Sequence, residues 1–318
     1  MKKVIFLTFL MSAMVACEQQ DVVCEDTENN ALKVEAEIAA STLDYSRTST
    51  TAKTVEFTQG DKIGFYMPEA ENSNSWTYSS GTWTATSDCV WPDKTNSYDF
   101  CAYYPFSQTA PRTEIPMPDL TTQEGGVDNL GKYDFLVARC TASYSTGDGV
   151  VSFTKDQAFK HVYALISVTL KTNTDTEGSH LTDLQLNSTN LLTSYTYHFG
   201  ESAEEDGVTL KGKGVDELLL QNLDVLIPSE GQNYVFVVNP LNLSLTMNLT
   251  VKYQRDGKKY TASAKIPTES VVKGSLNKLT ISIKKSGLVI EGNTVEDWVE
   301  QNMKDVVLEE NPDSTPGE

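Results

Sequence analysis

The sequence lacks the short motifs that usually mark an enzyme. Its 318 residues contain no G-x-S-x-G nucleophile turn, no H-E-x-x-H metal helix, no Walker phosphate loop and no complete dinucleotide fingerprint. The three histidines, His161, His180 and His198, are too dispersed in sequence to suggest a metal site, and we expect His161 to be a satisfied structural residue. The sequence therefore predicts a protein that is not an enzyme, without catalytic, cofactor-binding or metal-binding residues.

Acidic residues are abundant, but their spacing does not define a site. Residues 173–178 ("NTDTEG") resemble half of a calcium loop, yet Leu184 occupies the twelfth position, where a bidentate glutamate is required. Carboxylate pairs such as Glu204-Glu205 lie in charged loops, as they do in any acidic protein. We expect solvated turns at both places.

Positive charge is scarce. The 25 lysines and arginines are outnumbered by 44 acidic residues, which gives a formal charge of −19. Such a surface repels phosphate backbones, so nucleic acid is excluded as a partner. Only four arginines occur, and the first of them, Arg47, lies in the polar run "LDYSRTSTTAK".

Long apolar runs are absent after the first 17 residues. The leader "MKKVIFLTFLMSAMVAC" has a basic start, an apolar run and small residues before Cys17. This pattern is typical of a secretory signal peptide rather than of a membrane span or a buried N-terminal element. Its last four residues resemble the lipobox of bacterial lipoproteins, in which the cysteine thiol is acylated. We therefore predict a leader at residues 1–17 and a lipid on Cys17 that anchors the precursor in the outer membrane.

Paired cysteine motifs are also absent. Cys24, Cys89, Cys101 and Cys140 follow the leader without any C-x-x-C spacing. Export permits disulfides, and four thiols allow three pairings that the sequence does not separate. The last three cysteines lie in apolar, strand-like runs, which favours buried free thiols.

Short β-rich segments separated by turns fill most of the chain. Turn signals at Gly60-Asp61, Ser80-Gly81 and residues 255–258 predict hairpins. The pattern predicts an all-β protein made of two β-sandwiches. We expect an acidic tether at 18–30, an N-terminal sandwich at 31–147, a C-terminal sandwich at 148–286 and a separate C-terminal segment at 287–318.

The C-terminal segment has a different periodicity. Five of its residues fall on one helical face, and Thr294 with Asp297 resembles a capping box. A short amphipathic helix followed by a disordered tail is the first prediction, and an added strand is the alternative. The residues of the helical face are Val295, Trp298, Val299, Asn302 and Val306.

Aromatic residues are concentrated in the predicted hairpins of the N-terminal half. Trp76, Tyr78, Trp83 and Trp91 could form a platform on which sugars stack. Filling the core of a sandwich explains them equally well. Both interpretations stay open at this point.

The order of several motifs resembles a known family. The lipobox leader is followed by "FTQGDKIGFYM", "YDFCAYYPF", "YDFLVARC", "FKHVYALISVTLK" and "GLVIEGNTVEDWV". This order resembles the fimbrillins of the Bacteroidetes, the FimA/Mfa-like subunits of lipoprotein-derived pili. The resemblance covers nearly all of the mature chain and implies two transthyretin-like β-sandwich domains without catalysis.

The resemblance also implies a route of assembly. In that family an arginine-specific protease removes the first strand together with the lipid, and a strand from another subunit fills the groove left behind. In this chain the cut would follow Arg47, so that the mature protein begins at Thr48. The strand at 33–38 would be lost, and the donor would come from the segment after Ser286.

The implied function is that of a structural subunit of a cell-surface fimbria. Its partners would be other fimbrial subunits, in a homo- or hetero-polymer, together with a host or bacterial surface ligand if the fimbria is adhesive. Two alternatives stay open. One is a monomeric surface lipoprotein that binds glycans through its aromatic hairpins, and the other is an anchor or tip subunit in which Arg47 is not cut.

Overall fold

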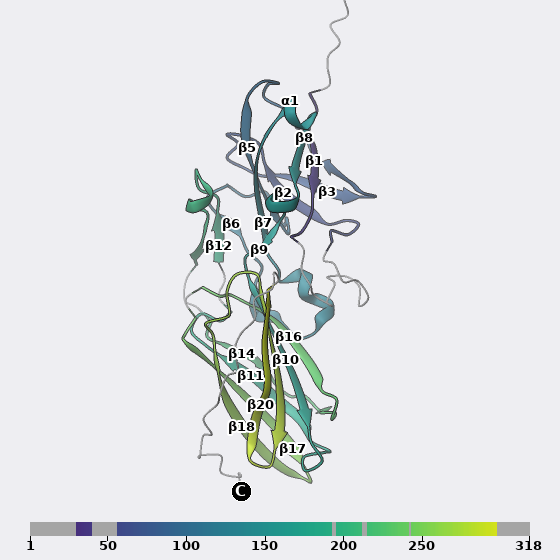
Figure 1. Cartoon of the computed structure of the whole chain (residues 1–318), viewed down its shortest axis with the longest axis vertical. Helices are drawn as coiled ribbons and strands as arrows, with labels where there is room; N and C mark the ends of the chain where they lie inside the picture. The colour runs from purple at the N-terminus through teal and green to yellow at the C-terminus, as the bar shows by residue number, and fades with distance from the viewer. Residues whose placement is uncertain (1–29, 40–55, 193–194, 212–214, 242, 298–318) are drawn as a thin grey trace, which may run out of the picture. The chain divides into compact units, whose positions relative to one another are not determined.

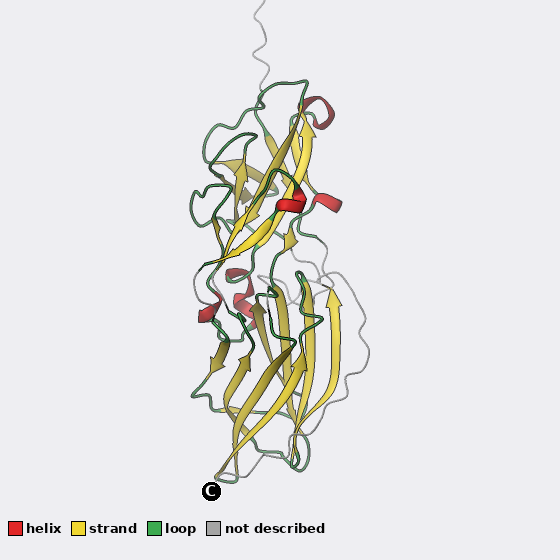
Figure 2. Ribbon diagram, turned by 90° about the vertical axis from the view of Figure 1, so that its left-hand side faces the viewer, coloured by secondary structure: helices red, strands yellow, loops and turns green. Residues whose placement is uncertain are grey.

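Strands dominate the structure. The computed structural model describes residues 30–39, 56–192, 195–211, 215–241 and 243–297, and the helical elements in these ranges are short turns (Figures 1 and 2). The all-β prediction is confirmed. The helical turns are η1 (Leu120–Thr122), η2 (Val127–Lys132), α1 (Tyr144–Gly147), η3 (Lys155–Gln157) and η4 (Ala203–Glu205).

Two sheets enclose the first hydrophobic core. A six-stranded sheet with the order β4-β3-β2-β5-β7-β9 faces a small sheet in which β1 and β8 run parallel. Side chains such as Phe65, Trp76 and Phe100 from the larger sheet meet Val34 and Phe153 from the smaller one. The strands are β1 (Lys33–Ala36), β2 (Lys62–Tyr66), β3 (Asn74–Ser79), β4 (Thr82–Ala85), β5 (Ser97–Tyr104), β7 (Leu136–Ser143), β8 (Val150–Phe153) and β9 (Lys160–His161).

Two further sheets enclose the second core. The sheet β16-β10-β19-β20 faces the sheet β14-β11-β17-β18, and β15 also pairs with β11. In β17, and in β11 apart from its bulge, buried side chains alternate with more exposed ones, as expected for a sandwich, whereas β10 and β19 are buried at most positions. The strands are β10 (Ala164–Thr172), β11 (His180–Asn187), β14 (Glu217–Leu220), β15 (Val225–Leu226), β16 (Gln232–Val238), β17 (Thr246–Arg255), β18 (Lys258–Pro267), β19 (Ser275–Lys284) and β20 (Gly287–Asp297).

A three-stranded sheet places aromatic residues against the six-stranded sheet, where Phe199 contacts Tyr66 of β2 and Tyr197 contacts Phe135 next to β7. It has the order β13-β12-β6, and Tyr195, Tyr197 and the following Phe199 are buried. Its strands are β6 (Ile115–Pro116), β12 (Tyr195–His198) and β13 (Gly207–Leu210). The first core also contains Val151, Phe153 and Phe159, which follow residue 147, the predicted end of the N-terminal sandwich. The domain boundaries at 147 and 286 stay predictions.

The "GDKIG" and "AYYPF" motifs contact each other in the first half of the chain. Asp61 accepts hydrogen bonds from the Thr58 backbone N–H (2.8 Å) and from the Tyr104 hydroxyl (3.1 Å). A Cβ atom on Gly64 would lie only 2.0 Å from the Tyr103 ring, so this position of β2 requires glycine. The two motifs therefore encode a single packing arrangement between β2 and β5.

The turn predictions had mixed outcomes. Hairpins at Ser80-Gly81 and at residues 255–258 are confirmed as the β3–β4 and β17–β18 connections. The hairpin at Gly60-Asp61 is wrong, because Phe57 lies outside any strand and β2 pairs with β3 and β5 instead. The "NTDTEG" segment is a turn, as predicted.

The C-terminal helix is wrong where the structure describes this segment. Residues 287–297 form β20, which pairs antiparallel with β19 of the same chain. Thr294 and Asp297 are strand residues rather than a capping box. The added-strand alternative is therefore the correct one for these residues. Trp298, Val299, Asn302 and Val306 lie outside the described residues.

Candidate functional site

The first strand lies inside the first core. Leu32, Val34 and Ile38 are 5–7% exposed, while Lys33 and Glu35 between them face solvent. The apolar side chains contact the same cluster as Phe153 and Phe159. The alternation that predicted a strand at 33–38 thus places one face of the strand in the core, and this part of the prediction is confirmed.

Backbone hydrogen bonds fix the first strand on both sides. The N–H groups of Lys33 and Glu37 donate to the carbonyl oxygens of Gly149 (3.0 Å) and Phe153 (2.9 Å). On the other side, the N–H of Leu32 donates to the Cys89 carbonyl oxygen at 2.9 Å. β8 pairs only with β1 within the described part of the chain. Removing β1 would therefore leave the carbonyl oxygens that β8 presents to it without their protein donors.

The side chains of this strand carry a large share of the stability of the first core. Burying one apolar side chain of the size of Val, Leu or Ile contributes about 1.5–3 kcal/mol. Three such side chains are comparable with the net stability of a whole domain, which is about 5–15 kcal/mol. The slot occupied by β1 must therefore be filled by an apolar strand for the first core to persist.

The predicted processing residues lie outside the described ranges. Cys17, Arg47 and Thr48 are not among the described residues, and neither is Cys24. Lipidation at Cys17 and cleavage between Arg47 and Thr48 stay predictions. Within the described ranges, no helix is both long enough and apolar enough to span a membrane.

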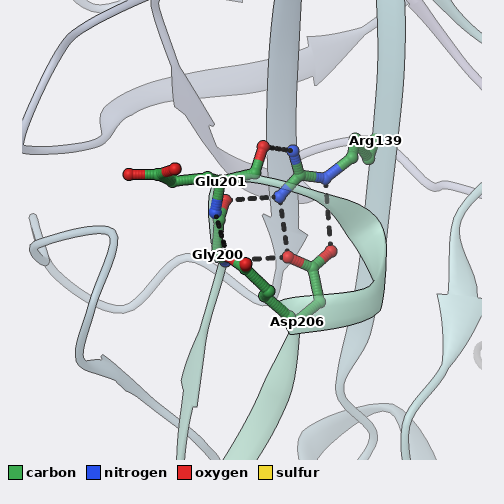
Figure 3. A network of polar contacts seen from close by, with 5 residues as sticks. Arg139, Gly200, Glu201 and Asp206 are labelled. Carbon is green, nitrogen blue, oxygen red and sulfur yellow. Dashed lines mark hydrogen bonds and ion pairs between the residues drawn. The ribbon is translucent and has the colours of Figure 1, made fainter.

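A polar network joins β7 to the three-stranded sheet. The Arg139 guanidinium on β7 contacts both carboxylate oxygens of Asp206, at 2.7 and 3.3 Å, and donates to the Gly200 carbonyl oxygen at 2.8 Å (Figure 3). Asp206 also accepts from the Gly200 N–H at 2.9 Å. Burial lowers the pKa of Arg139, but the Asp206 carboxylate, together with Cys101 and Asp99, raises it overall above its ordinary value. The Arg139 guanidinium therefore stays charged, and its bonds to Asp206 tie β7 to the three-stranded sheet.

This network was not predicted from the sequence. Arg139 and Asp206 are 67 positions apart, and no sequence signal linked them. An open cleft of about 320 Å³ lies beside them, also lined by Thr141 and Lys160. The described residues contain no group of three or more His, Cys, Asp or Glu side chains that could hold a metal ion.

The cysteines in the described ranges are inert. Cys89, Cys101 and Cys140 are buried free thiols, which confirms the expectation for these three. Burial raises the pKa of Cys101 to about 11 and that of Cys140 to about 12. Both remain protonated at neutral pH, so neither is poised as a nucleophile.

The glycan platform is wrong. Trp76, Trp83 and Trp91 are only 2–5% exposed and pack in the first core, and the Trp91 indole N–H donates to the Gly149 carbonyl oxygen at 2.9 Å. Tyr78 is only partly exposed and packs against Trp83. The core interpretation of these aromatic residues is the correct one.

His161 is buried beside a carboxylate. It is 8% exposed, and its Nδ1 lies 2.9 Å from the carboxylate of Asp134. His180 pairs with Asp224 at 2.9 Å on the surface of another sheet. The structure does not bring the histidines together.

Comparison with known proteins gives consistent relatives. A profile of fimbrillin-like sequences matches residues 47–298. A Bacteroides uniformis protein assigned as fimbrium subunit Fim1C is 24% identical over 315 residues, covering 92% of this chain and 95% of that protein. A crystal structure from B. uniformis, assigned to cell adhesion, has a TM-score of 0.56 at 21% identity and covers 85% of this chain and 98% of its own. A second crystal structure, from Bacteroides ovatus, has a TM-score of 0.56 at 15% identity and covers 86% of this chain and 99% of its own.

Proposed function

Because this chain belongs to the fimbrillin-like family, we propose that it is a structural subunit of a cell-surface fimbria and assembles with other fimbrial subunits. The observation that carries the proposal is the first strand, which is a separable piece of the first core. It contributes only Leu32, Val34, Ala36 and Ile38 to the interior and precedes the rest of the fold in sequence. An equivalent strand of another subunit could take its place.

Strand replacement would follow cleavage after Arg47. The strand at 33–38 and the lipid on Cys17 would leave together, because both precede the cut. A donor from the segment after Ser286 of another subunit would then restore the backbone bonds of Gly149 and Phe153. Until cleavage, the lipid would hold the precursor at the outer membrane.

The other arginines support a single cut. Arg112 stacks on Tyr66, with its Cζ atom 5.5 Å from the ring centroid, and its backbone N–H and carbonyl are both hydrogen-bonded. Arg255 stacks on Tyr260 at 5.0 Å and its side chain is 12% exposed, while Arg139 is paired with Asp206. A protease that must bind an extended segment around arginine would find these three held in the fold.

The test is the N-terminal sequence of the protein taken from intact cells. We expect Thr48 as the first residue of the assembled form and an Arg47→Ala variant that keeps residues 18–47 and forms no fibres. Arg112→Lys serves as the matched control and should be processed normally. Fibres of normal length built from Arg47→Ala chains that retain residues 18–47 would contradict cleavage-dependent assembly.

A further inference from the structure

The basic residues of this acidic protein are concentrated in one segment. Residues 246–285 contain nine lysines and arginines but only two acidic residues, Asp256 and Glu269. This segment has a net charge of +7, and the remaining residues together carry −26. It forms β17, β18 and β19. Opposite charges are thus held by different elements of the same chain, which favours contact between unlike surfaces.

The outer face of β17 and β18 gathers part of this positive charge. The register places Lys252 opposite Thr261 and Lys265 opposite Asn248, and directly opposed residues of antiparallel strands share a face. Lys252, Lys259 and Lys265 are all exposed, and we call them the lysine face. The other residues of this face are Asn248, Thr250, Gln254, Thr261 and Ser263, none of which is acidic.

The charge of the lysine face is largely uncompensated. On β19, Lys284 pairs with Glu291, and the next residue, Lys285, pairs with Asp175. Asp183 of β11 lies opposite Lys252. In contrast, the structure pairs no carboxylate of its described ranges with Lys259 or Lys265, which lie on the last strand of their sheet. Two lysines on an edge strand therefore remain available to an acidic partner.

A compact acidic surface occurs elsewhere in the chain. The turn at residues 201–206 ("ESAEED") contains four carboxylates, and we call it the acidic turn. Asp206 is neutralised by Arg139, whereas Glu201, Glu204 and Glu205 are exposed. Figure 3 shows the Glu201 carboxylate pointing away from the guanidinium. The turn is braced from within, because the Glu201 N–H donates to the Glu205 carboxylate at 3.0 Å.

We infer that the lysine face of one copy of this chain binds the acidic turn of a second copy. The two surfaces belong to different elements, so the contact is heterologous and leaves one of each surface free on every pair. Such contacts extend into an open chain of copies unless the rotation closes a ring. The link to a fibre rests on the proposed function, but the contact itself does not. Because the charges are exposed, the contact is weakened by salt.

The first test is zero-length carbodiimide cross-linking of an equal mixture of ¹⁵N-labelled and unlabelled full-length chains. At low ionic strength we expect mixed-isotope peptides that join Lys259 or Lys265 to Glu201 or Glu204. Salt at about 0.5 M should abolish them, since it shortens the screening length to a few ångströms. Cross-links that carry a single isotope only, or that persist unchanged in salt, would overturn the inference.

A charge swap provides the decisive variants. Lys259→Glu/Lys265→Glu and Glu201→Lys/Glu204→Lys should each reduce mixed-isotope cross-links at least tenfold, and an equimolar mixture of the two variants should restore them. The control, Lys62→Glu/Lys132→Glu, makes the same change in charge at exposed lysines outside the lysine face and should cross-link normally. Failure of the mixture to restore the contact would contradict the pairing.

The competing explanation is that the lysine face binds a polyanion instead of a second copy. Dextran sulfate is the probe for this alternative. Binding of dextran sulfate that is lost in Lys259→Glu/Lys265→Glu, without cross-links between copies, would replace the inference. The two proposals fail separately. Cells without fibres whose chains still cross-link through these residues would contradict the proposed function alone, and fibres whose chains do not cross-link there would contradict this contact alone.

Discussion

The first and last strands of the described fold are held in different ways. β1 has four residues, pairs in parallel with β8 and places its apolar side chains in the first core. β20 has eleven residues, pairs antiparallel with β19 along its whole length and forms one edge of its sheet (Figure 1). The first strand is thus held mainly by burial, and the last mainly by its backbone ladder.

This difference indicates that β1 is easier than β20 to replace with a strand of another sequence. Any strand with apolar residues at alternate positions could satisfy the β1 slot, because the slot selects for size and hydrophobicity. β20 has a more specific attachment. Its register shifts between Thr280 and Ile281 of β19, so Glu291 is the extra residue of a bulge. Its carboxylate contacts Lys171 of β10 at 2.5 Å and Lys284 of β19 at 3.5 Å.

The largest expected effect comes from placing a charge in the β1 slot. Val34→Asp would bury an unpaired carboxylate among Phe153 and its neighbours, and we expect a loss of about 3 kcal/mol or more in the free energy of unfolding. Urea unfolding of the uncleaved chain measures this loss. Glu35→Gln on the exposed face of the same strand should change stability by about 0.5 kcal/mol or less. Equal losses in both variants would show that burial does not hold β1.

A smaller effect is expected from the interior face of β20. Ile290 is only partly buried against the second core, so Ile290→Ala should cost about 1–2 kcal/mol, at or below the low end for a fully buried isoleucine. Hydrogen exchange of the β19–β20 amides should rise in parallel. If Ile290→Ala proved more costly than Val34→Asp, the contrast between the two strands would be reversed.

The smallest effect concerns the ion pairs of the bulge. Hydrogen bonding to Lys171 and Ser282 lowers the pKa of Glu291 to about 2 from its ordinary value of 4.5. Because the folded-state pKa is the lower one, this contribution to stability is complete above the unfolded pKa and is lost as the pH falls toward about 2. Glu291→Gln should remove this part of the acid dependence and cost about 0.2–1 kcal/mol at pH 7. If the difference in the free energy of unfolding between Glu291→Gln and the parent stayed the same from pH 6 to pH 2, the role of Glu291 in acid dependence would be contradicted.

The same two strands show what the sequence could and could not predict. In β1 the alternation of Val34, Ala36 and Ile38 with charged residues is uninterrupted, and its period of two correctly predicted a half-buried strand. In β20 the bulge at Glu291 shifts the alternation by one residue. The helical interpretation came from the helical spacing of Val295 and Trp298 and from Thr294 with Asp297, which resembles a capping box. These local signals do not reveal that β19 lies alongside this segment and pairs with it.

The polar contacts were less accessible to sequence reasoning than the strands. Arg139 and Asp206 come from distant segments, and nothing near either residue indicates the other. The aromatic residues were ambiguous for another reason, since Trp76 and Trp83 suit a sugar platform as well as a core. Only their burial, which depends on how the sheets stack, separates the two interpretations.

The close packing of Tyr103 on Gly64 links the backbone of β2 to the loop that follows β5. The Tyr103 hydroxyl bonds Ser73 at 3.1 Å and the Gln108 carbonyl oxygen at 3.0 Å, and Ser73 in turn accepts from the Ala110 N–H. A methyl group on Gly64 would clash with the Tyr103 ring and displace the hydroxyl that bonds Ser73 and Gln108. The conformation of the loop after β5 thus depends on the spacing between β2 and β5. A substitution at Gly64, inside the sheet, is therefore expected to loosen this loop.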